Sequence, residues 1–344
     1  MPRISPDDAL ALWRRADLYS LGERARKIRD EKSDPAVVTY VVDCNVNYSN
    51  VCAATCSFCA FYRRPGDPDA YSLSLPEIDR RIHALVAVGG TQLLMQGGLN
   101  PDWRLADFER LFSHIKKEFP TVDIHCLSPV EIAFLARLER LSIREVLERL
   151  KTAGLDSLPG GGAEILVDRV RKELTKGKAM TDEWLEVMRQ AHRLGMPSTA
   201  TMMFGHIETI EERIEHLLRI RELQDETGGF TAFIPWTYQP GNTELGGREV
   251  GAFEFLRTLA LSRIFLDNFT NVQTSWLTPG EKIGQIGLFF GANDMGGTLL
   301  EEHVVHATGV SRSITEERLI RLISDAGFRP QKRNTYYKHL PAAA

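Results

Sequence analysis

The sequence predicts an α/β fold of the (β/α)8 TIM-type barrel class, preceded by an N-terminal helical extension. Two observations support this fold class. From residue 36 onward, short runs rich in β-branched and apolar residues alternate with longer amphipathic runs, a pattern typical of a parallel sheet covered by helices. There are eight such short runs, which is the number of strands in a barrel of this class. A partial six-stranded barrel with a C-terminal subdomain is the alternative prediction.

The first residues predict the helical extension. Ser5 and Asp8 have the spacing of a capping box, and apolar residues recur at helical spacing between Ala9 and Leu21. We therefore expect helix over residues 5–32. The chain divides accordingly into an extension, residues 1–35, and a barrel with a closing helix and tail, residues 36–344.

The barrel elements follow in order. The strand candidates are enriched in Val, Ile, Leu, Met and Thr and are bounded by Gly, Pro or polar turn residues. They are residues 37–43, 91–96, 122–127, 155–158, 198–204, 231–236, 271–276 and 291–295. The helix candidates begin at cap residues or long amphipathic runs and end near Gly or Asn. They are residues 74–90, 181–195, 210–227, 252–268 and 313–327.

Composition excludes several classes of function. The 344 residues carry a formal net charge of −4, so the chain lacks the basic footprint of a nucleic-acid-binding protein. No apolar run approaches the ~18 residues of a membrane span. The first residues lack the apolar segment of a secretory signal. We expect a cytoplasmic protein with neither nucleic acid nor membrane as a partner, in a compartment where thiols stay reduced.

Three closely spaced cysteines are the strongest functional signal. Cys52, Cys56 and Cys59 follow the first strand candidate with the spacing Cys-x3-Cys-x2-Cys. Three thiolates can hold three irons of a 4Fe-4S cubane, which leaves the fourth iron open to a small molecule. The spacing therefore predicts an iron–sulfur cluster with chemistry of its own.

Other kinds of cysteine site fit this pattern less well. A closed zinc site needs four ligands, and the remaining candidates, Cys44 and Cys126, lie in apolar runs that predict buried side chains. A ferredoxin run has Cys-x2-Cys spacings with a final Cys-Pro. A disulfide framework is typical of short secreted chains. An iron–sulfur or zinc-stapled binding protein without catalysis is the non-enzymatic alternative.

The cysteine motif, with Phe58 just before its last cysteine, resembles the signature of the radical S-adenosylmethionine (SAM) superfamily. The resemblance implies that SAM binds the open iron and that Phe58 lies near its adenine. The turn Gln96-Gly97-Gly98 follows the second strand candidate, and its glycines permit close approach of the backbone. The resemblance implies that this turn contacts the methionine amine of SAM.

Two further turns follow the third and fourth strand candidates. Ser128 and Glu131 have capping-box spacing and are both candidates to bind the cofactor, and Glu131 is also a candidate to cap the next helix. The run 160–162 is three consecutive glycines, which favours close approach to a bound molecule. The resemblance implies that Glu164 binds the SAM ribose hydroxyls and that Arg169 binds its carboxylate.

Polar and aromatic residues follow the later strand candidates, and in a barrel such positions face the active site. His206, Glu208 and Asp294 are the candidate proton acceptors, with His206 as the best-placed general base. The candidate substrate-binding residues are Trp236, Gln239, Asn242, Gln273, Ser275 and Asn293.

Longer segments resemble the menaquinone and F420 branch of the radical SAM enzymes. They are residues 159–165, 199–206 and 224–230. Within that branch, residues 233–243, 275–276 and 291–298 are most similar to the enzymes that cyclise dehypoxanthine futalosine. Aminofutalosine synthases and 7,8-didemethyl-8-hydroxy-5-deazariboflavin (FO) synthases are the alternatives within the branch.

The resemblance implies a reaction and its partners. An electron from a donor such as a flavodoxin or ferredoxin splits SAM into methionine and a 5′-deoxyadenosyl radical. That radical removes hydrogen from the sugar-derived ring of the small-molecule substrate. The carbon radical closes a ring onto the benzoate of the same molecule, and loss of a proton and an electron restores aromaticity. The cofactors carry this chemistry, and the protein supplies position and exclusion of solvent.

Overall fold

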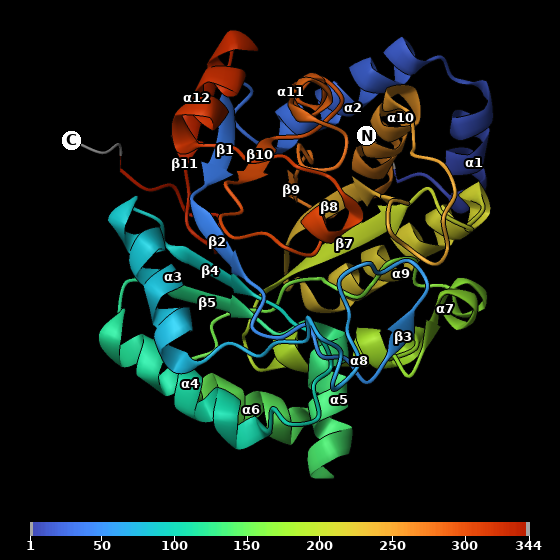
Figure 1. Ribbon diagram of the computed structural model, residues 1–344. Helices are drawn as coiled ribbons and strands as arrows, with labels where there is room; N and C mark the ends of the chain where they lie inside the picture. Colours follow the sequence, from blue (N-terminus) through green and yellow to red (C-terminus); the bar gives the residue numbers. More distant parts are fainter. Residues whose placement is uncertain (1–2, 342–344) are drawn as a thin grey trace.

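The computed structural model describes residues 3–341, so residues 1–2 and 342–344 of the predicted domains lie outside it. The strands occupy the interior and the helices surround them (Figure 1). The strands are β1 Val37–Val41, β2 Asp43–Val46, β3 Thr55–Cys56, β4 Gln92–Met95, β5 Asp123–Cys126, β6 Thr175–Lys176, β7 Ser198–Phe204, β8 Phe230–Thr237, β9 Asn271–Val272, β10 Asp294–Gly297 and β11 Arg329–Lys332.

The interior strands pair in sequence order. The sheet β2-β4-β5 is parallel, and so is the sheet β7-β8-β9. Single parallel bridges His125–Ser157 and Leu158–Ser198 join the two sheets, and a bridge at Gln273 joins the second sheet to β10. β10 pairs with β1, which continues into β2 after Val42. This is a TIM-type α/β arrangement.

Most of the predicted strands are present, and three differ. Residues 155–158 contribute only single bridges at Ser157 and Leu158, and the predicted strand 271–276 is reduced to β9 and a bridge at Gln273. The predicted strand 291–295 is displaced to β10. These segments are short, so their length depends on the neighbours that hydrogen-bond to them.

The helices lie outside the strands. They are α1 Pro6–Arg15, α2 Leu18–Lys32, α3 Leu75–Ala87, α4 Leu105–Glu118, α5 Pro129–Glu139, α6 Ile143–Ala153, α7 Asp168–Leu174, α8 Thr181–Arg193, α9 Ile210–Thr227, α10 Ala252–Phe265, α11 Glu281–Gly287 and α12 Glu316–Asp325. Among the residues that the structure describes, no helix combines the length and apolarity that crossing a membrane requires.

The N-terminal segment forms two helices where the sequence predicts one. The capping box of Ser5 and Asp8 is present at the start of α1. Asp17 interrupts the helical run because its carboxylate accepts a hydrogen bond from the Ser20 N–H and so begins α2. α1 packs against α9, and α2 packs against α10.

Alternate side chains along each strand point outward into the apolar core and inward into the ring of strands. In β7, Thr199 and Thr201 face an inner cavity, whereas Ala200 and Met202 lie between the sheet and the surrounding helices. In β8, Trp236 likewise faces the cavity. The apolar core is thus a layer outside the strands, and the interior keeps polar side chains for a ligand.

The strand β11 is an addition that the sequence analysis does not predict. It pairs in parallel with β1, and Arg333, Thr335 and Tyr337 after it line the inner cavity. Arg333 donates hydrogen bonds from Nε and Nη2 to the Asp294 carboxylate at 2.5 and 3.0 Å. Burial disfavours the charged form of Arg333, but the negative charge of Asp294 outweighs this effect and raises the pKa of Arg333. This buried ion pair ties the tail to β10.

Replacing Arg333 with Met should lower the free energy of unfolding by about 3 kcal/mol, because Asp294 is left buried without its partner. The measurement is the midpoint of urea unfolding. Arg329→Met is the matched control, since Arg329 lies in β11 but forms an exposed ion pair with Asp34 at 3.3 Å. The control should cost less than about 1 kcal/mol. Equal losses for both variants would show that the buried pair does not hold the tail.

Candidate functional site

A cavity of about 250 Å³ lies within the ring of strands. Every interior strand segment contributes to its lining, which mixes polar groups with an apolar wall. Five predicted site residues line it: Gln96, Glu164, Trp236, Gln273 and Ser275. The apolar wall consists of Val41, Leu94, Ile234, Trp236, Leu277, Leu299, Val304 and Val305. A molecule with both a polar and an apolar part matches this lining.

The cysteine loop lies at the carboxyl end of the first strand. Its short strand β3 pairs antiparallel with β6, and the Leu99 N–H donates a hydrogen bond to Cys52 Sγ at 3.3 Å. Cys56 is buried, whereas Cys52 and Cys59 are partly exposed. Burial raises the pKa of Cys56 to about 12, and the negative charges of Glu164, Cys59 and Cys52 act in the same direction.

Burial therefore disfavours the thiolate form of Cys56, and the positive charge of Lys178 opposes this effect. A further cationic centre would favour the thiolate, and a cluster of iron provides one. In the described part of the chain, no three His, Cys, Asp or Glu side chains are grouped as ligands for a single metal ion. In a cubane, each thiolate binds a different iron, so the thiols of a cluster stand farther apart than the ligands of one ion.

The buried Glu131 carboxylate joins three loops at this end of the ring. Its Oε2 accepts hydrogen bonds from the Ser128 N–H and hydroxyl at 2.7 and 2.6 Å. Its Oε1 accepts from the Tyr48 hydroxyl at 2.9 Å and from the Gly97 N–H at 3.0 Å. Burial raises the pKa of Glu131, and these donors oppose the rise. The predicted capping box is present, but all four bonds are internal and Glu131 does not line the cavity.

The glycines of the predicted site make room for neighbouring protein. A Cβ on Gly98 would lie 2.2 Å from the Val51 carbonyl oxygen, so this glycine seats the second turn against the cysteine loop. A Cβ on Gly161 would lie 2.2 Å from Gln96 Nε2. Gly162 has φ +73°. The turn 160–162 is thus shaped by its contacts with the protein as well as by its place in the cavity wall.

Glu164 and a lysine that the sequence analysis does not identify form a buried pair beside the cysteine loop. Lys178 Nζ donates a hydrogen bond to Glu164 Oε1 at 2.5 Å and lies 5.2 Å from the centre of the Phe58 ring. Glu164 Oε2 is buried and has no hydrogen-bond partner among the residues that the structure describes. A buried acceptor without a donor has room for a hydroxyl group, and SAM carries two on its ribose.

Burial opposes the charge on Lys178, but Glu164 and Cys56 together raise the pKa of the lysine. It therefore stays protonated beside the cysteine loop, although the nearby charge of Arg171 opposes this. Sequence spacing gives no signal for this residue because it follows β6, outside the main series of strands.

Arg169 lies away from the cavity, and its predicted role as the ligand of the SAM carboxylate stays a prediction. It is half exposed on α7 and binds Glu212 through two hydrogen bonds of 2.6 Å, with a further ion pair to Glu173. It does not line the cavity. Its position on the outer face of a short helix favours the ordinary surface role of an arginine.

His206 and Glu208 also lie outside the cavity lining. Both side chains are fully buried, with His206 Nδ1 2.9 Å from Glu208 Oε2 and His206 Nε2 3.1 Å from the Met203 carbonyl oxygen. Burial favours neutral Glu208, but the hydrogen bond and charge of His206 and the charge of Arg213 prevail and lower its pKa to about 2. A carboxylate held this strongly ionised, away from the cavity, is a poor proton acceptor for a ligand.

Four further predicted residues also lie outside the cavity lining. Asp294 is fully buried and is bound by Arg333, and Asn293 binds Arg263 and the backbone of β9. Asn242 is exposed and donates to the Ala307 carbonyl oxygen. Gln239 is buried, with Oε1 unpartnered, but is outside the lining. These four residues support the loops around the cavity.

Several cavity residues were missed because they lie inside strands or in the tail. Asp43 and Asn45 alternate along β2, His125 lies in β5, and Arg333 and Tyr337 enter from the tail. The available signal was the period-two alternation of polar residues within an apolar strand, which marks the inward face.

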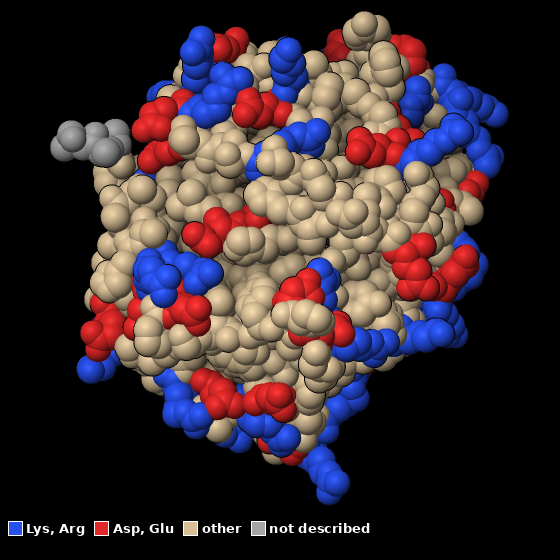
Figure 2. Space-filling model, viewed as in Figure 1, with Lys and Arg blue, Asp and Glu red and all other residues tan. Residues whose placement is uncertain are grey.

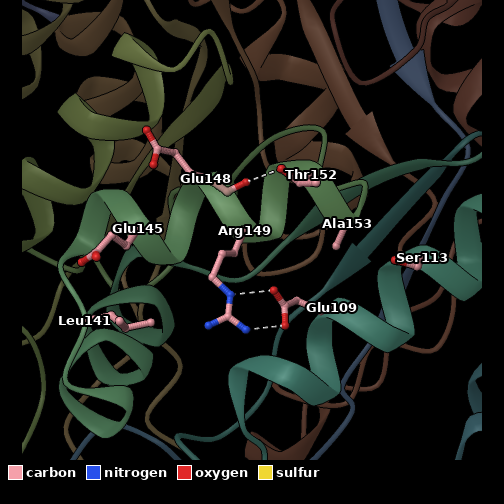
Figure 3. A pocket seen from close by; sticks show the side chains of 8 residues that line it. All are labelled: Glu109, Ser113, Leu141, Glu145, Glu148, Arg149, Thr152 and Ala153. Atoms are coloured by element: carbon pink, nitrogen blue, oxygen red, sulfur yellow. Dashed lines mark hydrogen bonds and ion pairs between the residues drawn. The ribbon is translucent and has the colours of Figure 1, made fainter.

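A second hollow, of about 460 Å³, lies on the outer surface between α4 and α6 (Figure 3). Its only cationic lining residue is Arg149, whose guanidinium is bound by the Glu109 carboxylate at 2.7 and 2.6 Å. Glu145 accepts from Ser142 in a capping box. Because these groups are already paired, the hollow offers little to a ligand.

Figure 2 shows that, on the face it draws, the middle is mostly uncharged and the charged side chains gather toward the edge.

This fold, with a Cys-x3-Cys-x2-Cys loop at the carboxyl end of its first strand, defines the class of protein. Residues 46–220 match the radical SAM superfamily, and residues 227–344 match the CofH/MqnC C-terminal region. The chain belongs to the radical SAM superfamily, in the branch with the CofH/MqnC C-terminal region. The enzymes of this superfamily use a 4Fe-4S cluster and SAM, and the three thiols and the unpartnered Glu164 Oε2 fit these groups.

The chain is similar to curated proteins over nearly its whole length. It is 46% identical to the cyclic dehypoxanthine futalosine synthase of Streptomyces coelicolor, over 98% of this chain and 86% of that protein. It is 41% identical to the synthase of the same name from Halalkalibacterium halodurans, over 98% and 91%. It is 39% identical to the aminodeoxyfutalosine synthase of Thermus thermophilus, over 98% and 92%.

Solved structures support the fold. Methylornithine synthase has a TM-score of 0.74 at 20% identity, covering 96% of this chain and 94% of that chain. The hydrogenase maturase HydG from Carboxydothermus hydrogenoformans has a TM-score of 0.78 at 18% identity, covering 98% and 78%. At these identities the likeness concerns the fold alone.

Replacing Glu131 with Gln should destabilise the protein by about 2–3 kcal/mol, because an amide NH2 then faces hydrogen-bond donors in a buried site. The fraction of protein that holds a full cluster should fall as well, since the loop after β2 loses its anchor. The measurements are urea unfolding and iron content after anaerobic reconstitution. Glu77→Gln is the matched control, because Glu77 forms an exposed capping box with Ser74. A control loss as large as that of Glu131→Gln would contradict this role.

Proposed function

We propose that this protein is a cyclic dehypoxanthine futalosine synthase, which closes a ring within dehypoxanthine futalosine on the futalosine route to menaquinone. The observation that carries the proposal is the near full-length similarity, at 46% and 41% identity, to two curated proteins of that name. The cavity is compatible with it, since an apolar wall suits the benzoate ring and polar strand residues suit the sugar.

Aminodeoxyfutalosine synthase is the second candidate, because a curated relative of that name is 39% identical over 98% of the chain. The two activities differ in the fate of the adenosyl group. It ends in the product of the second candidate, whereas the proposed reaction releases 5′-deoxyadenosine. The run from Trp236 to Pro240, which resembles the cyclising enzymes, favours the first.

We propose Cys52, Cys56 and Cys59 as the ligands of the cluster, with Glu164 and Lys178 as SAM-binding residues. The reduced cluster with SAM supplies hydrogen abstraction from the substrate. Glu164 Oε2 would accept from the ribose, and Lys178 would pair with the carboxylate in place of Arg169. Phe58 would pack beside them, since its ring already lies near Lys178. The strands around the cavity exclude solvent from the reacting carbon.

The remaining proposals concern the domains, the electron donor and the cellular location. We propose a complete (β/α)8 barrel over residues 36–344 with residues 1–35 as a helical extension. A flavodoxin or ferredoxin would supply the electron at the partly exposed cysteine loop. A thiolate-held cluster requires a reducing compartment, so we propose a cytoplasmic location.

The function is tested by product analysis under anaerobic conditions. The reconstituted, reduced protein receives SAM and dehypoxanthine futalosine, and the products are identified by mass spectrometry. We expect free 5′-deoxyadenosine together with a product that has lost two hydrogens. Conversion of an enolpyruvyl benzoate to an adenosyl-containing product would favour the second candidate instead. No SAM cleavage from a protein with a full cluster would contradict both.

Replacing Cys56 with Ala should abolish cluster binding and 5′-deoxyadenosine formation, because a missing thiolate leaves a second iron without a protein ligand. Iron and sulfide content and liquid chromatography of the nucleoside measure these effects. Cys126→Ala is the control, since Cys126 is buried in β5 and does not line the cavity. It should keep both properties. A Cys56→Ala protein that retains a full cluster would exclude Cys56 as a ligand.

Replacing Lys178 with Gln should weaken SAM binding about 10–100-fold, the equivalent of a charge-assisted hydrogen bond of about 1.5–3 kcal/mol. Equilibrium dialysis of the reconstituted protein with SAM measures the Kd, and iron content verifies the cluster. Arg169→Gln should bind SAM like the unmodified protein, because Arg169 is paired on the surface of α7. The opposite ranking of the two variants would restore Arg169 as the carboxylate ligand.

A further inference from the structure

Ring closure leaves a proton to be removed, and the cavity shows which residue can take it. This inference rests on the proposed function. When the sugar carbon bonds to the benzoate ring, the attacked ring carbon carries both the new bond and its original hydrogen. Aromaticity returns when that hydrogen leaves as a proton and one electron passes to a one-electron acceptor, a role that the oxidised iron–sulfur cluster would fill when bound. We propose that the carboxylate of Asp43 accepts this proton.

Asp43 has the required position. It lies at the start of β2, and its side chain lines the same cavity as Trp236 and Gln273. Its Oδ1 is held by the Leu299 N–H at 2.7 Å, and its Oδ2 receives only a long hydrogen bond from Gln92 Nε2, at 3.3 Å. A carboxylate has about four acceptor sites. Oδ2 therefore retains the capacity to accept a proton.

The neighbouring strand leaves space for this carboxylate. A Cβ on Gly297 would lie 2.2 Å from Asp43 Oδ1 and 2.5 Å from Oδ2. Gly297 itself lines the cavity. Any larger residue at position 297 would displace the Asp43 carboxylate, so the place of this carboxylate depends on Gly297.

The charges around Asp43 suit a general base near neutral pH. Burial raises its pKa to about 6, while the Leu299 N–H and the positive charge of Arg333 limit the rise and Asp294 adds to it. Cys44 is the adjacent titratable residue, and the charge of Asp43 contributes to raising the pKa of its thiol to about 12. Asp43 is then ionised above pH 6, and a base of that pKa is well matched to proton transfer at neutral pH.

The other bases in the lining are less suitable. Glu164 is paired with Lys178 at the cluster end. The Glu302 carboxylate accepts hydrogen bonds from the Val305 and His306 N–H groups. Burial together with the charge of Arg333 lowers the pKa of His125 to about 3, so its imidazole binds a proton weakly. Among the three carboxylates, Asp43 alone has neither a salt-bridging partner, as Glu164 has, nor hydrogen bonds from the start of a helical turn, as Glu302 has.

The test compares the unmodified protein with Asp43→Asn and a matched control, Asp123→Asn. Asp123 lies in the same row across β2, β4 and β5, through Gln92, but does not line the cavity. Each reconstituted holoenzyme receives SAM and dehypoxanthine futalosine between pH 5 and pH 8. The readout is the molar ratio of cyclised product to 5′-deoxyadenosine, with iron content and circular dichroism as checks on the fold.

We expect Asp43→Asn to lower this ratio about 100-fold at pH 8 while SAM is still cleaved, because loss of a general base costs about 10²–10⁴-fold. The control should keep the ratio of the unmodified protein. An unchanged ratio in Asp43→Asn would overturn the proposal, as would loss of SAM cleavage in a folded variant with a full cluster.

If Asp43→Asn does not fold, the pH dependence of the product ratio in the unmodified protein tests the proposal instead. Its ratio should fall as the pH drops through about 6 and Asp43 becomes protonated. A ratio that is flat between pH 5 and pH 8 would contradict the proposal. If the unmodified protein cleaves SAM but forms no cyclised product at any pH, the proposed function itself fails, and the variants are not needed to show it.

Discussion

The Glu131 carboxylate is the constraint on which the site depends. One buried side chain accepts hydrogen bonds from Tyr48, Gly97 and Ser128, which belong to the loops after three consecutive parallel strands. The loop with Tyr48 continues directly into the cysteine motif, so its position is fixed relative to the turn with Gly97. A charged acceptor without donors would be costly in this interior, and so the three loops must lie together for the protein to fold.

The cavity follows from the same arrangement of strands. Parallel strands with period-two alternation direct apolar side chains such as Ala200 and Met202 toward the helices and leave Thr199 and Thr201 inside. The inner residues can therefore be polar without loss of the core. Arg333, which is paired with Asp294, lines the cavity together with Tyr337, so the C-terminal tail helps to enclose it. A reaction with radical intermediates needs this separation from solvent.

The sequence predicts this fold well where local signals are long. Strand 198–204 and helix 210–227 were predicted with their actual bounds, because a β-branched run and a capped amphipathic run are unambiguous. β11 could not be predicted, since Arg329-Pro-Gln-Lys332 has no alternation and acquires strand geometry only by pairing with β1. The site was predicted by the rule that ligands bind after strands, which finds Gln96 and Glu164 but also proposes His206, whose loop folds away from the cavity. That rule cannot find Asp43 within a strand or Lys178 after β6.

The central claim is that the cavity holds the substrate so that its sugar-derived ring faces the cofactors and the adenosyl group leaves as 5′-deoxyadenosine. The most direct measurement uses dehypoxanthine futalosine carrying deuterium at the sugar carbon that forms the new bond. Mass spectrometry of the 5′-deoxyadenosine then shows where the label goes. Our account predicts that one deuterium is transferred from substrate to 5′-deoxyadenosine for each ring closed. Unlabelled 5′-deoxyadenosine alongside cyclised product would contradict it, as would an adenosyl group bound covalently in the product.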